Sequence, residues 1–326
     1  MKPANLFVFV LSITLLVSFS VLSAQSEAEQ ETQKASQNKE ETKEQEPAPE
    51  QEVGEDANTE GKVESAIRLE RSKIKIAPPV ALDKQQKSDL SHYISKSELS
   101  PVLVGPDELI TLVQDSSTRN NKGVVIFIPD WQQSPVSPKA INFLRNSLPA
   151  QGWVTIAMQA TNKPSNYPSQ AEKASEQAEE NQKTLADYQE SFTAKLEAVL
   201  KKAKEYPGLV LIASAGNHAG LLFDIFQQGK IESPSGVMIL SGFMLTEVAD
   251  KTFAHHMASS EFPVFDILLR NDHPLVFNSA RQRKIYADKE MKVYYRQRQL
   301  NNFSSGYYPD QALLKEINGW LKSIGW

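Results

Sequence analysis

One segment in the middle of the chain constrains the fold more than any other. Residues 208–220 (GLVLIASAGNHAG) contain an aliphatic run at 209–213, then a glycine-rich stretch, then residues compatible with a helix. A continuous apolar run of this length, bounded by glycine, is typical of a strand that is covered on both faces. The segment therefore predicts a buried strand that passes through a tight turn into a helix at 219–226.

The same alternation of strand and helix patterns recurs along most of the chain. Apolar runs at 102–104 and 108–113 flank Gly105-Pro106-Asp107, which predicts an antiparallel hairpin through a turn. Further strands are predicted at 123–129, 153–158, 237–240, 264–269 and 293–298, and further helices at 139–151, 172–204, 279–287 and 313–324. Strands joined by helical crossovers pair in parallel. The sequence therefore predicts an α/β fold with a mostly parallel sheet, an N-terminal antiparallel hairpin and helices on both faces.

The first 97 residues divide into three segments of different composition. Residues 1–24 combine a basic start, an apolar run and small residues at the end, which is the layout of a secretory signal peptide. Residues 25–64 hold thirteen acidic and four basic residues and no aromatic residue, so they predict a disordered acidic tether. We interpret residues 65–97 as a connecting segment and residues 98–326 as the folded domain.

The leader at residues 1–24 has a second interpretation. Leu22 is bulky for the third position before a cut after Ala24, as it would be in an uncleaved signal anchor. The apolar run is shorter than the ~20 residues that a membrane span needs. Its length favours cleavage, and hence a periplasmic or secreted bacterial protein that contacts a membrane only if the leader is kept.

Composition excludes several kinds of site and partner. The chain has no cysteine, which rules out disulfides, a thiolate nucleophile and cysteine-ligated metals. From residue 65 onward the net charge is only +3 and no basic stripe is present, so binding to nucleic acid is not expected. We predict a monomer with no cofactor and no metal, whose partner is a small molecule or a component of the cell envelope.

Five short stretches carry a resemblance to a known family. They are 123–130 (GVVIFIPD), 148–153 (LPAQGW), 262–266 (FPVFD), 295–297 (YRQ) and 317–321 (INGWL). In this order they resemble a family of secreted bacterial proteins, domain of unknown function family 3530, within the α/β-hydrolase superfamily. The resemblance spans residues 88–326 and implies the α/β-hydrolase fold.

The resemblance also implies where a nucleophile, an acid and a histidine base would lie. In a serine hydrolase of this fold the nucleophile is at the centre of a G-x-S-x-G turn, but the matching residues 216–220 (GNHAG) have His218 at the centre. Asp272, shortly after the strand at 264–269, fits the acid. No histidine occurs at 299–311, where the base is expected, and Pro129 has no N–H group to donate to an oxyanion.

Two arrangements would restore a reactive group. In the first, the turn is shifted by four residues and Ser214 is the nucleophile, with Asp272 and a displaced histidine, His273 or His218; otherwise Ser214 only bonds to nearby backbone. In the second, His218, Asp272 and His273 together bind a metal or activate a water. The alternative is that both histidines are ordinary helix-end and loop residues, since no recognised ligand spacing is present.

Two residues after the strand at 123–129 are predicted to bind a ligand together with His218. Asp130 and Trp131 follow that strand at the carboxyl edge of the sheet, where ligands bind in open α/β sheets. The leading hypothesis is an exported binding protein or pseudo-hydrolase, a pseudoenzyme without a Ser-His-Asp triad. The alternative hypothesis is an active esterase or amidase that uses Ser214.

Overall fold

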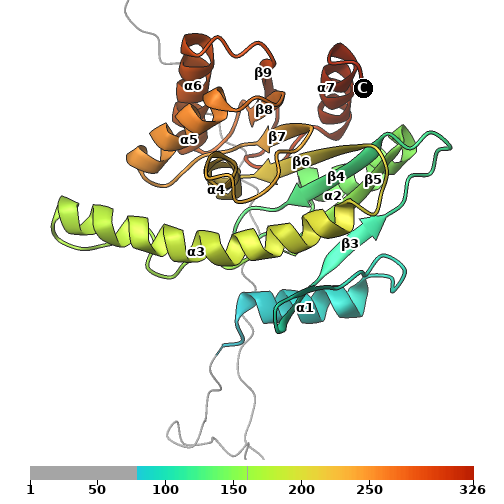
Figure 1. Cartoon of the computed structure of the whole chain (residues 1–326), viewed down its shortest axis with the longest axis horizontal. Coiled ribbons are helices and arrows are strands. Elements are labelled where there is room, and N and C mark those ends of the chain that lie inside the picture. The colour runs from blue at the N-terminus through green and yellow to red at the C-terminus, as the bar shows by residue number, and fades with distance from the viewer. Residues whose placement is uncertain (1–78, 160) are drawn as a thin grey trace, which may run out of the picture. The chain divides into compact units, whose positions relative to one another are not determined.

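The computed structural model describes residues 79–159 and 161–326 (Figure 1). The predicted leader, the acidic tether and residues 65–78 of the connecting segment lie outside these residues. Within the described part of the chain, no helix is both long enough and apolar enough to cross a membrane.

A mostly parallel sheet forms the centre of the described residues and confirms the predicted fold class. Its strand order is β3-β5-β4-β6-β7-β8-β9, and only β3 runs antiparallel to its neighbour. The bounds are β3 Thr111–Gln114, β4 Gly123–Ile128, β5 Trp153–Met158, β6 Leu209–Ala215, β7 Gly236–Leu240, β8 Val264–Leu269 and β9 Tyr295–Leu300. Side chains of β4 and β5 are buried throughout, as expected for strands covered on both faces.

The predicted hairpin forms, but its second arm is divided. Residues 102–104 (β1, Val102–Val104) pair with β2 (Asp107–Leu109), whereas β3 leaves the hairpin and pairs with β5. The predicted arm at 108–113 therefore belongs to two sheets, and Ile110 lies between the two strands.

Helices cover both faces of the sheet. Helices α1 (Leu82–Tyr93), α2 (Ala140–Ser147) and α7 (Asp310–Ser323) contribute to the apolar cluster on one face. Helices α3 (Ala174–Ala203), α4 (Asn217–Gln227), α5 (Glu247–Ser259) and α6 (Pro274–Lys289) contribute to the cluster on the other face. The N-terminal half of α3 extends past the sheet in Figure 1, and most of its side chains are exposed.

Two helices differ from the prediction. Helix α5 was not predicted as an element, because five charged or histidine positions interrupt its apolar pattern: Glu247, Asp250, Lys251, His255 and His256. Helix α6 begins at Pro274 rather than at 279, since the Nδ1 atom of His273 accepts the N–H of Leu275 and proline suits the first helical position.

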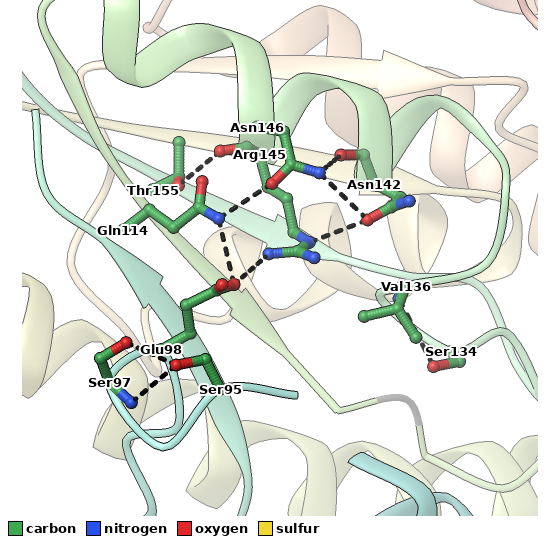
Figure 2. Close-up of polar contacts among 10 residues, drawn as sticks. All are labelled: Ser95, Ser97, Glu98, Gln114, Ser134, Val136, Asn142, Arg145, Asn146 and Thr155. Carbon is green, nitrogen blue, oxygen red and sulfur yellow. Dashed lines mark hydrogen bonds and ion pairs between the residues drawn. The ribbon is translucent and has the colours of Figure 1, made fainter. Parts of the chain in front are cut away.

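A polar network attaches the segment before the sheet to α2 (Figure 2). One oxygen of Glu98 accepts hydrogen bonds from Nη1 of Arg145 at 2.9 Å and from Nε2 of Gln114 at 3.0 Å. The carbonyl of Arg145 accepts the hydroxyl of Thr155 at 3.0 Å. Glu98 therefore connects the incoming chain to α2 and, through these partners, to strands β3 and β5.

A buried ion pair fixes the other end of the sheet. Asp266 on β8 and Arg283 on α6 are fully buried, and the guanidinium Nε lies 2.9 Å from a carboxylate oxygen. Arg283 also donates to the carbonyl of Gly242 at 2.9 Å, and Tyr295 on β9 donates its hydroxyl to Asp266 at 2.8 Å. These bonds hold β8, β9 and the loop after β7 around one pair of charges.

Removing one partner of this pair leaves a buried charge without compensation. We expect Arg283→Met to lower the free energy of unfolding by about 3–5 kcal/mol. Lys204→Met, which breaks the exposed pair between Lys204 and Glu232, serves as the control and is expected to change stability little. Urea denaturation measures both variants, and an Arg283→Met protein as stable as the control would contradict the structural role of the pair.

Candidate functional site

The carboxyl ends of the parallel strands surround a cleft of about 180 Å³. Five of its lining residues each follow a different strand: Asp130 after β4, Gly216 after β6, Ser241 after β7, Asp272 after β8 and Tyr308 after β9. Ligands of open α/β sheets bind at this edge. The cleft is therefore the candidate functional site.

The sharp turn between β6 and α4 is at Gly216. Its backbone has φ 55° and ψ −130°, and α4 begins at the next residue. This conformation strains any residue other than glycine. The prediction that His218 is at the centre of the turn is wrong, because the turn comes two residues earlier and His218 already belongs to the helix. Gly216 thus has the place that a nucleophilic serine has in a G-x-S-x-G turn.

The side chain of Asp130 fills the space above Gly216. A Cβ atom built on Gly216 would lie 2.1 Å from both Cγ and Oδ2 of Asp130. Real Cβ atoms do not approach other atoms this closely, so a side chain at position 216 requires Asp130 to move. We call the turn at Gly216, between β6 and α4, the elbow. In the structure the elbow has neither a nucleophile nor room for one.

Asp130 also accepts a hydrogen bond that an oxyanion would need. Its Oδ1 atom accepts the backbone N–H of Asn217 at 2.9 Å, and the neighbouring backbone of Trp131 helps to lower the pKa of the carboxyl. In α/β-hydrolases the residue after the nucleophile and a residue in the loop after the equivalent of β4 supply the oxyanion donors. Burial raises the pKa of the Asp130 carboxyl, while these contacts and the charge of Lys139 lower it by less.

Ser214 is not near a base. It is fully buried within β6, and its Oγ atom has no hydrogen-bond partner among the described residues. No imidazole therefore lies within the ~3 Å that a general base needs. The geometry required for Ser214 to act as a nucleophile with His273 or His218 is not present in the structure.

Asp272 instead bonds to a serine on the neighbouring strand end. The Oγ atom of Ser241 donates to Oδ2 of Asp272 at 2.5 Å, and the hydroxyl of Tyr308 lies 2.5 Å from the same Oγ. Since the serine proton goes to the carboxylate, Tyr308 donates to Ser241. Ser241 has φ 50°, a left-handed conformation that is uncommon for serine. Burial raises the pKa of Tyr308, so its hydroxyl stays protonated.

His273 lines the cleft but is otherwise engaged. Its ring stacks on Phe243 with the centroids 5.3 Å apart, and its Nδ1 atom accepts the N–H of Leu275 at 3.3 Å. His273 is exposed, whereas Ser214 and His218 are buried, and it forms a hydrogen bond with neither of them.

His218 lies in the core on the other side of the turn. Its Nδ1 atom is 2.5 Å from the carbonyl oxygen of Pro129, so Nδ1 carries the proton, and Nε2 accepts the hydroxyl of Tyr188 at 2.7 Å. The side chain is 1% exposed. Burial lowers the pKa of His218 to about 4, so the ring is neutral near pH 7. The structure gives His218 contacts within the protein and no surface toward the cleft.

Trp131 also points into the core rather than into the cleft. Its ring packs edge-on against Tyr167, Tyr188 and His218, with centroids 5.8 to 6.0 Å apart. Only Asp130 of the three predicted ligand-binding residues therefore lines the cleft. Among residues 79–159 and 161–326, no group of three or more His, Asp or Glu side chains is arranged to hold a metal ion.

A family model described as "Protein of unknown function (DUF3530)" matches residues 5–323. The chain belongs to this family. No curated protein matches it.

Several solved structures named as esterases or hydrolases are similar to this DUF3530 protein at low sequence identity. Est1E from Butyrivibrio proteoclasticus is 9% identical with a TM-score of 0.49, and the match covers 69% of this chain and 99% of that one. The Pyrococcus furiosus esterase Pf2001 is 12% identical with a TM-score of 0.48, covering 77% and 98%. A putative dienelactone hydrolase from Klebsiella pneumoniae is 9% identical with a TM-score of 0.48, covering 69% and 98%.

Sequence reasoning missed three residues of the cleft in this DUF3530 protein. Gly216 was assigned to the frame of the turn rather than to its centre, and Ser241 was not singled out. Tyr308 follows the last strand, in the stretch where a histidine base was expected. The signal for Ser241 was its position after the apolar run of β7, at the same sheet edge as Asp130 and Asp272.

The contact between Asp130 and Gly216 can be tested by a double-mutant cycle. We expect Gly216→Ala to lower the free energy of unfolding by at least about 2 kcal/mol, from backbone strain and overpacking. In an Asp130→Ala background the same change is expected to cost less, because the obstructing carboxylate is gone. An equal cost in both backgrounds, measured by urea denaturation, would show that Asp130 does not fill this space.

The neutral state of His218 predicts a dependence of stability on pH. The unfolded chain protonates this histidine below its ordinary pKa near 6.5, whereas the folded chain resists protonation until about pH 4. Stability therefore falls as the pH drops through this window, by up to about 1.4 kcal/mol per unit from this group.

Urea denaturation at pH 7, 6 and 5 measures this contribution. His218→Gln is expected to show a shallower loss of stability than the unmodified protein, while His92→Gln, at an exposed histidine, keeps the original slope. Equal slopes for His218→Gln and the unmodified protein would contradict the buried neutral state.

Proposed function

We propose that this α/β-hydrolase-fold protein binds a small molecule in the cleft at the carboxyl edge of its sheet and does not hydrolyse substrates at the elbow. The leader-like residues 1–24 support a periplasmic or secreted location, where the protein acts as a monomer. The observation that carries the proposal is the position of Asp130 over Gly216.

Two features of that position oppose acyl transfer at the elbow. Gly216 supplies no attacking atom, and the carboxylate of Asp130 accepts the N–H of Asn217 that would otherwise stabilise an oxyanion. A negative charge at this point repels the developing charge of a tetrahedral intermediate. Loss of a single oxyanion donor typically costs ~10²–10³ in rate, and here the nucleophile is missing as well.

One observation favours a second candidate function, which is hydrolysis of a small ester or amide by another serine. Ser241 lines the cleft and its hydroxyl donates to Asp272, so a serine and a carboxylate are in contact one strand away from the elbow. Asp272 would have to act as the base without a histidine. This candidate replaces the predicted Ser214 as nucleophile and keeps Asp272.

A fluorophosphonate probe separates the two candidates. We expect no covalent labelling of the purified protein and no turnover of short-chain p-nitrophenyl esters, because no serine in the cleft is paired with an imidazole. Intact-protein mass spectrometry detects the adduct, and Ser241→Ala and Ser214→Ala identify its site.

Labelling that disappears only in Ser241→Ala would support the second candidate and overturn the first. Labelling that disappears only in Ser214→Ala would show that the buried strand opens and would restore the predicted Ser214 nucleophile. Absence of labelling in all three proteins is the result that the binding proposal predicts.

A further inference from the structure

We infer that the cleft binds a small ligand with a primary ammonium group, whose cationic nitrogen pairs with the carboxylate of Asp130. This inference rests on the proposed function, since it names the class of ligand for the same cleft. It follows from the hydrogen bonds that the two carboxylates of the cleft accept, since neither Asp130 nor Asp272 has an ion-pair partner in the described part of the chain.

The second carboxylate of the cleft is already satisfied by the protein. Asp272 accepts the hydroxyl of Ser241 at 2.5 Å, the N–H of Leu269 at 3.0 Å and the N–H of His273 at 2.9 Å. The hydroxyl of Tyr308 donates to Ser241 in turn. This group of side chains forms a closed hydrogen-bonded wall, so it is not the anchor for a ligand.

Asp130 has hydrogen bonds but no cation. Its Oδ1 atom accepts the N–H of Asn217 at 2.9 Å, and its Oδ2 atom lies over the bare Cα of Gly216. Among residues 79–159 and 161–326, no Lys, Arg or His side chain forms an ion pair with this carboxylate. Lys139 also lines the cleft, but it forms no ion pair with this carboxylate and acts on it only through its charge. A half-buried carboxylate without a close counter-charge favours a cationic ligand.

The size and walls of the cleft restrict the rest of the ligand. Its volume of about 180 Å³ is below the ~300–1,000 Å³ of pockets that hold drug-sized molecules. Ile141, Phe243 and Val276 give part of the wall an apolar surface. A short aliphatic chain attached to the ammonium group matches both features, whereas an anion would meet the carboxylates of Asp130 and Asp272.

The electrostatics of Asp130 agree with this inference. Burial raises the pKa of its carboxyl, which means that the charged form lacks solvation that a bound cation would replace. The groups that lower this pKa are Asn217, through its hydrogen bonds, the backbone of Trp131 and the charge of Lys139.

The test uses three probes of similar size and different charge. The ¹⁵N-labelled protein is titrated with n-butylammonium, n-butanol and butyrate. The amide signals of Asn217, which bonds the Asp130 carboxylate, and of the adjacent Trp131 report on binding. We expect saturable shifts with n-butylammonium, at least about tenfold tighter than with n-butanol, because a charge-assisted hydrogen bond is stronger than a neutral one.

A matched pair of variants assigns the binding to Asp130. Asp130→Asn keeps an oxygen that can accept the N–H of Asn217 but removes the charge, and it is expected to weaken n-butylammonium binding at least about tenfold. Glu232→Gln removes an exposed carboxylate far from the cleft lining and is expected to leave binding unchanged. Unchanged thermal stability of Asp130→Asn excludes unfolding as the cause.

Each outcome has a distinct meaning. Binding of n-butanol or butyrate as tight as that of n-butylammonium, or n-butylammonium binding that survives Asp130→Asn, overturns the ligand class but leaves the cleft as a binding site. No saturable shift with n-butylammonium also overturns the ligand class. Labelling of Ser241 by the fluorophosphonate probe, by contrast, overturns the proposed binding function itself.

Discussion

Two adjacent hydrogen bonds between the end of β4 and the start of α4 determine the character of the candidate site. The carboxylate of Asp130 accepts the N–H of Asn217, and the imidazole of His218 donates to the carbonyl of Pro129. The first bond places a negative charge over Gly216 on the cleft side. The second turns His218 into the core, where burial keeps it neutral. The turn therefore presents no nucleophile to the cleft, because the Asp130 carboxylate lies over Gly216 and the His218 ring lies in the core.

The remainder of the cleft depends on the neighbouring strand ends. The register of β6 and β7 pairs Ala215 with Leu240, so Gly216 and Ser241 leave the sheet side by side, both with positive φ. Arg283 fixes the loop after Ser241, because it donates to the carbonyl of Gly242 and is paired with the buried Asp266. A buried charge network, rather than the apolar core alone, therefore supports the strained wall of the cleft.

The fold was predictable from the sequence, but the orientation of the site residues was not. Continuous apolar runs identify β4, β5 and β8 almost to the residue, because both faces of these strands are buried. The motif at 216–220 gave the turn but not its centre, since only the backbone angles show that Gly216 makes it. Whether Trp131 or His218 faces core or cleft depends on aromatic partners such as Tyr188, which come from a distant helix. The contact of Asp272 with Ser241 likewise arises only from strand order.

The character of the site depends on the hydrogen bond from the N–H of Asn217 to the Asp130 carboxylate at the elbow. The most direct measurement is an NMR titration that follows the Asp130 carboxyl carbon and the Asn217 amide proton together. We predict that both signals titrate with one pKa, higher than that of an ordinary aspartate, and that Asp130→Asn abolishes the amide titration. An Asn217 amide that does not respond to the ionisation of Asp130 would show that this hydrogen bond is absent and that the elbow N–H is free for an oxyanion.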